Sequence, residues 1–243
     1  MYLSPIEKNM SKIINQIVLF LFFLNLSLIA KPVISYKVGD NLYVLAKSGL
    51  NLRDKPSKNG RFLQTVSFGT VALVRQITDK EYDVEGIPGF WVKVIADDRE
   101  GYLFDGYLSS YPPPVSELPS KSNPTLKQYA DKYLPKGTKV TESTDDSMVT
   151  TSTLVLPLAR LEEAYLLGVC FVYNFDKYKY PRKSDKIKFQ DTEVEFNVIR
   201  DKSGQVKSVS VIETYIQSGG TVSLVVSDLG SLGSEIKTIY SAP

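Results

Sequence analysis

The strongest constraint on the fold is a series of short segments between Tyr36 and Tyr111 in which apolar and polar side chains alternate at a period of two. No helical period in this region lasts longer than about two turns, so the pattern indicates strands. Turn-forming residues separate the segments. We therefore predict an all-β domain with strands at residues 41–46, 49–53, 62–66, 71–77, 90–96 and 102–108, and loops at 54–60, 78–88 and 97–101.

The pattern changes in the second half of the chain, where helical and hairpin signals both occur. Residues 126–134 predict a short helix, and residues 158–168 predict a second helix whose apolar face includes Leu158. A helix that lies on an antiparallel meander buries one sheet face and leaves the other to solvent. The alternating segments predict an α+β domain with strands at residues 153–156, 187–189, 193–200, 206–217, 222–227 and 236–240.

A proline-rich stretch separates the two regions. Residues 112–124 hold five prolines among small polar residues. This composition is typical of an extended, semi-rigid spacer, and a proline-rich ligand for another module is the alternative. The predicted organisation is a β domain at 31–111, a linker at 112–124 and an α+β domain at 125–243.

The amino terminus has the layout of a secretory signal. Lys8 and Lys12 precede a mostly apolar run at 17–30, which is shorter than the roughly 20 apolar residues that a spanning helix needs. Cleavage after Ala30 fits this layout, although Leu28 stands where a smaller residue is preferred, so an uncleaved anchor is the alternative. We expect an exported protein that is periplasmic, surface-exposed or secreted, with residues 1–30 as its signal peptide and membrane contact only through that segment.

Histidine is absent from the sequence. The chain therefore lacks the usual residue for acid–base catalysis near neutral pH, the commonest zinc ligand and the usual partner of a nucleophilic serine or cysteine. We expect no catalytic residues, no metal site and no cofactor. The net charge of +2 is spread along the chain, which gives no electrostatic footprint for nucleic acid. The sequence does not indicate an oligomeric state.

Several short motifs follow one another in the first domain. In order and approximate spacing the set resembles the bacterial SH3 domain over about 60 residues. The resemblance implies a mainly β fold that begins with an SH3-like small β-barrel, a binding module and not an enzyme. Two departures are an extra Phe90 and the long acidic segment 78–88. The motifs are Leu50-Asn51-Leu52-Arg53, Pro56, Phe68-Gly69-Thr70-Val71, Gly89-Phe90-Trp91-Val92-Lys93-Val94, Gly101-Tyr102-Leu103 and Tyr107-Leu108.

Strand phase predicts which side chains of this barrel face outward. If Val92 and Val94 point into the core, Trp91 points out. An exposed tryptophan beside aromatic neighbours would suit sugar rings or extended peptide, and rim packing is the alternative. An arginine at a strand end could clamp a ligand carboxylate, or could hold its own loop by pairing with Asp54 or Glu100. The candidate ligand-binding residues are Arg53, Tyr82, Trp91, Tyr102 and Tyr107.

The second domain offers weak candidates for chemistry. Adjacent residues on a helix point in different directions, so Glu162 and Glu163 are expected on its wet face. Exported barrels of this family often accompany cysteine peptidases, but Cys170 has no histidine base and is expected to be a buried apolar filler. The basic, tyrosine-containing segment 177–188 is either a solvated loop or a contact for an anionic polymer or lipid.

The resemblance implies peptidoglycan as the ligand. The first functional hypothesis is a non-catalytic cell-envelope binding protein that recognises peptidoglycan or a related wall ligand. The second is an interaction scaffold that binds an envelope or host protein and no glycan. An enzyme with its chemistry in the second domain is the third, and the absence of histidine argues against it.

Overall fold

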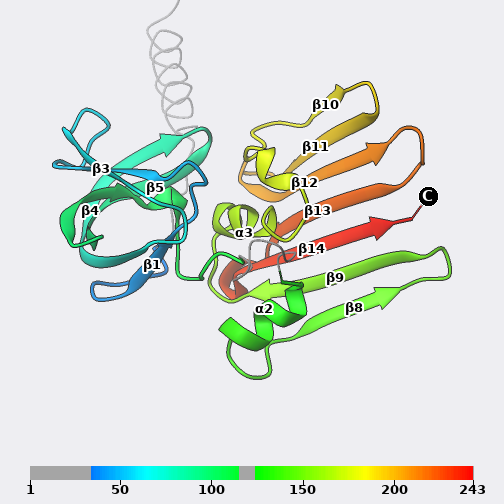
Figure 1. Cartoon of the computed structure of the whole chain (residues 1–243), viewed down its shortest axis with the longest axis horizontal. Coiled ribbons are helices and arrows are strands. Elements are labelled where there is room, and N and C mark those ends of the chain that lie inside the picture. Colours follow the sequence, from blue (N-terminus) through cyan, green and yellow to red (C-terminus); the bar gives the residue numbers. More distant parts are fainter. Residues whose placement is uncertain (1–33, 115–123, 243) are drawn as a thin grey trace, which may run out of the picture. The chain divides into compact units, whose positions relative to one another are not determined.

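The computed structural model describes residues 34–114 and 124–242 (Figure 1). The expected signal segment at 1–30 and most of the expected linker lie outside the described residues. Contacts join the two described ranges into one compact unit. Among the described residues, no helix is long and apolar enough to cross a membrane.

The first half of the described chain forms a curled antiparallel sheet (Figure 1). Its strand order is β3-β2-β6-β5-β4-β1-β7, and a 3-10 helix, η1 (Asp105–Tyr107), precedes the last strand. Val92 and Val94 point into its core, as strand phase predicts. The strands are β1 (Asn41–Val44), β2 (Leu50–Arg53), β3 (Phe62–Val66), β4 (Val71–Val84), β5 (Ile87–Ala96), β6 (Arg99–Phe104) and β7 (Leu108–Ser109).

The prediction of a loop at 78–88 was wrong. β4 continues to Val84 and β5 starts at Ile87, so these residues form a hairpin with a two-residue turn. Glu85 and Gly86 both have positive φ, 55° and 86°, as a turn that matches the right-handed twist of two strands requires. A shift of register between Ile77 and Glu81 interrupts the alternation, which explains why the pattern indicated a loop.

The second half contains a seven-stranded antiparallel sheet with the order β10-β11-β12-β13-β14-β9-β8. Helices α2 (Leu126–Tyr133) and α3 (Leu161–Gly168) contact this sheet (Figure 1). The predicted fold class, a small β-barrel followed by an α+β region with a helix on an antiparallel meander, is confirmed. The strands are β8 (Val140–Thr144), β9 (Val149–Leu156), β10 (Asp185–Lys188), β11 (Thr192–Arg200), β12 (Val206–Tyr215), β13 (Thr221–Asp228) and β14 (Ser234–Ser241), and the 3-10 helices are η2 (Phe175–Lys177) and η3 (Gly230–Leu232).

Helix α3 begins three residues later than the pattern predicts. Leu158 lies in a turn with a φ of 61° and is 66% exposed, so it takes no part in the apolar face of the helix. At the other end, Gly168 lies against Leu224 of β13, and a Cβ at Gly168 would come within 2.9 Å of that side chain. The glycine therefore allows a close approach of helix and sheet.

The start of the expected linker is packed against the fold. Pro113 and Pro114 are buried, and the Tyr129 hydroxyl of α2 donates a hydrogen bond of 2.8 Å to the Pro112 carbonyl. The spacer role predicted for 112–124 remains a prediction for residues 115–123, which lie outside the described chain.

The two halves share a hydrophobic core. Leu45 and Ile87 of the first half belong to the same buried cluster as α3 and the inner face of the second sheet. The residues that line the barrel interior form a separate cluster. The boundaries 31–111 and 125–243 remain a prediction, but the shared core indicates that the halves do not fold as separate bodies.

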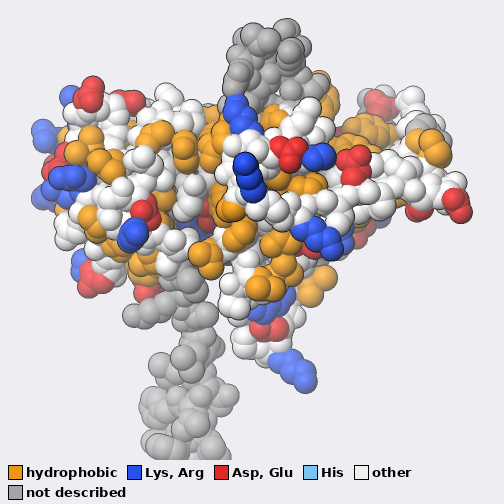
Figure 2. Space-filling model, turned by 90° about the horizontal axis from the view of Figure 1, so that it is seen from below, with side chains coloured by type: hydrophobic (Ala, Val, Ile, Leu, Met, Phe, Trp, Pro, Cys, Tyr) orange, Lys and Arg blue, Asp and Glu red, His pale blue; other side chains and the backbone are white. Residues whose placement is uncertain are grey.

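Charged side chains of both signs are interspersed on the face of the molecule seen in Figure 2. Lysine and arginine alternate there with aspartate and glutamate, and apolar side chains lie between them. This distribution agrees with a net charge that is spread along the sequence.

Substitution of Leu45 tests the shared core. Because Leu45 is buried in a core cluster made mostly by the other half, Leu45→Ala should lower the free energy of unfolding by about 2–5 kcal/mol. Fluorescence of Trp91, the single tryptophan, and far-UV circular dichroism should follow one coincident transition in guanidinium chloride. Val38→Ala, at an exposed site, is the control and should change stability by less than about 0.5 kcal/mol. Separate transitions for the two probes would contradict the shared core.

Candidate functional site

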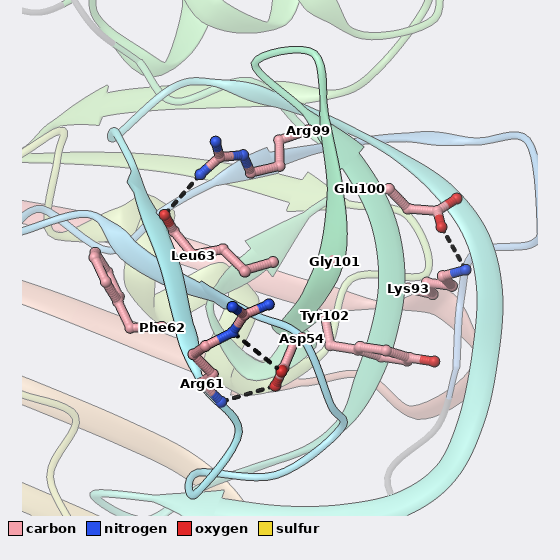
Figure 3. Close-up of a pocket in the computed structure, with 9 residues that line it drawn as sticks. All are labelled: Asp54, Arg61, Phe62, Leu63, Lys93, Arg99, Glu100, Gly101 and Tyr102. Carbon is pink, nitrogen blue, oxygen red and sulfur yellow. Dashed lines mark hydrogen bonds and ion pairs between the residues drawn. The ribbon is translucent and has the colours of Figure 1, made fainter.

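A pocket of about 730 Å³ opens on the first sheet (Figure 3). Strands β3, β5 and β6 and the loop after β2 form its walls. The lining mixes apolar, aromatic, acidic and basic side chains, which suits a ligand with both apolar and charged groups. The lining residues are Asp54, Arg61, Phe62, Leu63, Lys93, Arg99, Glu100, Gly101 and Tyr102.

Regular strand pairing places the central residues of the pocket. Lys93 of β5 pairs with Tyr102 of β6, which in turn pairs with Arg53 of β2. Gly101 brings β6 close to β2, because a Cβ there would lie 2.8 Å from the Arg53 carbonyl oxygen. A larger residue at position 101 would therefore disturb the strand pairing beside the pocket.

The charged groups of the pocket are mostly paired. Lys93 Nζ lies 2.5 Å from Glu100 Oε1, and this contact raises the pKa of the Lys93 amine. Asp54 accepts a hydrogen bond of 2.7 Å from the Arg61 backbone N–H and lies 3.4 Å from the Arg61 Nε. Both carboxylates are thus held within the pocket wall (Figure 3).

Arg99 differs from the other charged residues of the pocket. Its Nη1 donates a hydrogen bond of 2.8 Å to the Leu63 carbonyl, and it forms no ion pair with any carboxylate of the described chain. Three cations and two carboxylates line the pocket, so its formal charge is +1.

Arg53 holds its own loop and does not line the pocket. Its Nη1 donates a hydrogen bond of 2.8 Å to the carbonyl of Gly60, at the end of the loop that follows β2. Sequence analysis left a loop-holding role open, with Asp54 or Glu100 as the partner. The structure shows a backbone carbonyl as the partner instead.

The Trp91 side chain is only 5% exposed, so of the two roles that the sequence left open the structure supports rim packing and not an exposed aromatic platform. Strand phase was correct, since Trp91 lies opposite Val92 and the barrel core. The outer face is covered by aromatic rings, with Tyr82 at 6.2 Å and Phe104 at 6.3 Å between centroids. Tyr82 reaches Trp91 because β4 is longer than the sequence pattern indicates.

The predicted aromatic residues do not form one platform. Tyr82 and Tyr107 are half-buried; Tyr82 contacts both Trp91 and Phe104, and Tyr107 joins the cluster through Phe104, whose ring lies 5.9 Å from Tyr82 and 6.2 Å from Tyr107. Tyr102 lies apart from this cluster and is the one predicted binding residue that lines the pocket. The other lining residues were not predicted as binding residues from the sequence, although Phe62, an exposed aromatic residue on a strand, was a usable signal.

A buried carboxylate, that of Asp105, connects the aromatic residues of the first half to the second half. Asp105 is 1% exposed and accepts hydrogen bonds of 2.6 Å from the Tyr36 hydroxyl and the Phe90 N–H. Arg160 lies 3.8 Å from the Asp105 carboxylate and donates a hydrogen bond of 2.9 Å to the Asp105 carbonyl. Burial raises the pKa of the Asp105 carboxyl, and Arg160 opposes this shift.

The expectation that Glu163 faces solvent was also wrong. Its side chain is 2% exposed, and its carboxylate accepts hydrogen bonds of 2.7 Å from the Ser109 hydroxyl and 2.9 Å from the Ser110 N–H. Burial raises the pKa of this carboxyl. The first turn of α3 is therefore fixed to the end of the first sheet. Its neighbour Glu162 is half-buried.

A family model of the bacterial SH3 domain matches residues 48–109. This segment is a bacterial SH3 domain. The match extends from before β2 to the end of β7 and includes all nine residues that line the pocket. No curated protein and no solved structure gives a significant match to the chain. The second half lies outside the SH3 match.

Truncation of Trp91 should therefore destabilise the SH3 domain. Because the ring is buried among other aromatic side chains, Trp91→Ala should lower the free energy of unfolding by about 3–5 kcal/mol. Urea denaturation followed by far-UV circular dichroism measures this loss. Tyr102→Ala, at the half-exposed pocket position, is the comparison and should cost less than half as much. Equal stability of Trp91→Ala and the wild type would contradict the buried position of the Trp91 side chain.

The buried Glu163 should make stability depend on pH in a defined direction. Its pKa is higher in the folded than in the unfolded chain, so its contribution to stability is present at low pH and is lost as pH rises through the folded pKa. Glu163→Gln has no proton to lose. The variant should therefore gain stability relative to the wild type between pH 4 and pH 7 in urea denaturation. Glu142→Gln, at an exposed site, is the control, and a difference independent of pH would contradict the prediction.

Proposed function

We propose that this protein is an exported, non-catalytic binding protein of the cell envelope, and that its SH3 domain holds peptidoglycan in the pocket beside Phe62 and Tyr102. The observation that carries the proposal is the pocket itself, which lies wholly within the segment that matches the SH3 family. Bacterial SH3 domains bind cell-wall components. The amino-terminal signal pattern supports export.

The chemistry of the pocket supports binding in preference to catalysis. General acid–base catalysis needs a group within reach of the substrate whose pKa suits proton transfer. The two carboxylates, Asp54 and Glu100, are instead paired with Arg61 and Lys93 in the wall. Rings and cations on well-ordered strands provide apolar contact and hydrogen-bond donors, which an extended wall polymer can use.

Phe62 is the most accessible ring of the pocket. It is 53% exposed at the start of β3, while Tyr102 lies at the centre of the strand ladder. An aromatic contact contributes about 0.5–1.5 kcal/mol beyond its buried area, so each ring should matter measurably for binding.

Co-sedimentation of the purified full chain with cell-wall sacculi tests the proposal. Phe62→Ala and Tyr102→Ala should each weaken binding by roughly three- to tenfold while the chain stays folded. Phe189→Ala is the matched control, because Phe189 is equally exposed at 53% but lies in the second half. Absence of the wild-type chain from the sacculus pellet would refute the proposal.

The same experiment distinguishes wall binding from the alternative function, a scaffold that binds another protein. If sacculi digested with muramidase lose the ability to pull down the chain, the wall polymer is the ligand. Capture of one stoichiometric protein partner that is unaffected by muramidase would favour the scaffold instead.

A further inference from the structure

Among the described residues, one cationic group of the pocket has no carboxylate partner. Lys93 lies against Glu100 and Arg61 lies against Asp54, whereas Arg99 contacts a backbone carbonyl and no carboxylate of the described chain. A guanidinium carries five N–H donors, and the contact with Leu63 uses Nη1. The remaining donors are available to a ligand at the pocket.

The second arginine lies on the other side of Leu63. In Figure 3 the Arg99 and Arg61 side chains come from opposite ends of the pocket wall, with the Leu63 side chain between them. Arg61 is 77% exposed and contacts Asp54 through Nε, so its two terminal nitrogens are not used in that ion pair. The pocket thus presents guanidinium donors around an apolar centre.

The chemical group that suits this arrangement of guanidinium donors best is a carboxylate. Guanidinium groups bind carboxylates with two parallel hydrogen bonds, and such charge-assisted bonds are about twice as strong as neutral ones. Neutral hydroxyl groups of a sugar chain gain no such pairing. The surplus charge of +1 in the pocket also favours an anionic group over a neutral one.

We propose that Arg99, assisted by Arg61, binds a carboxylate of the ligand, so that the SH3 domain recognises the carboxylate-bearing peptide part of the wall and not its neutral sugar backbone. This inference rests on the proposed function. It assigns Arg99 as the residue that determines specificity and places the apolar part of the peptide against Leu63 and Phe62.

The test compares sacculi with native carboxylates and sacculi whose carboxylates have been converted to amides. Arg99→Gln should bind native sacculi at least about tenfold more weakly than the wild type. Wild-type binding should fall by a similar factor on amidated sacculi, and the substitution should then have no further effect. Lys80→Gln is the matched control, because it removes a surface charge from β4 outside the pocket and should leave binding unchanged.

A second variant separates binding from folding, because Arg99 also holds the Leu63 carbonyl. Arg61→Gln leaves that bond intact and should weaken binding to native sacculi by about two- to fivefold, again without effect on amidated sacculi. Equal losses on native and amidated sacculi, or full wild-type binding after amidation, would overturn the inference and leave the proposed function standing. Failure of the wild type to bind native sacculi would overturn both.

Discussion

The contact between Arg160 and Asp105 is the interaction on which the arrangement of the two halves depends. Both side chains are removed from water, and a buried charge is costly unless it is paired and hydrogen-bonded. Asp105 meets this requirement through Tyr36, Phe90 and Arg160 together. Because Arg160 also bonds to the backbone of η1, the start of α3 has a fixed position on the SH3 domain. The second sheet packs on α3 and is positioned in turn.

Two unusual segments of the sequence, one acidic and one basic, contact each other where the two halves meet. The acidic segment of the β4–β5 hairpin departs from the SH3 pattern, and a basic segment follows η2 in the second half. In the structure Glu85 lies 2.6 Å from Lys179, and Asp83 lies 4.0 Å from Arg182. The lengthened β4–β5 hairpin thus contacts the basic segment. Exposed ion pairs contribute little to stability, so these contacts favour one orientation of the hairpin more than they strengthen the fold.

Local pattern was sufficient to predict most strands, because alternation along a strand directly reflects which side chains face the core, and the resemblance to the bacterial SH3 domain supplied the barrel. It placed Val92 and Trp91 on opposite faces correctly. It could not show that Tyr82 and Phe104 cover the outer face, since that depends on residues distant in sequence. The burial of Glu163 could not be predicted for the same reason, because its partner Ser109 lies 54 residues away in the sequence. Of the candidate site, the sequence identified Tyr102 and offered a signal for Phe62, an aromatic residue on a strand, while Arg61 and Arg99 required the curvature of the sheet.

The absence of a side chain at Gly101 has a consequence for the strands beneath the pocket. A Cβ at this position would lie 2.7 Å from the Leu52 side chain and 2.8 Å from the Arg53 carbonyl oxygen, so a larger residue would push β6 away from β2. Rim positions such as Arg61 and Phe62 are exposed, so their replacement leaves the barrel interior untouched. Substitutions at these exposed positions should therefore change what the pocket contacts without disturbing the strands that form it. The strands of the pocket are thus constrained at Gly101, whereas its exposed edge is not.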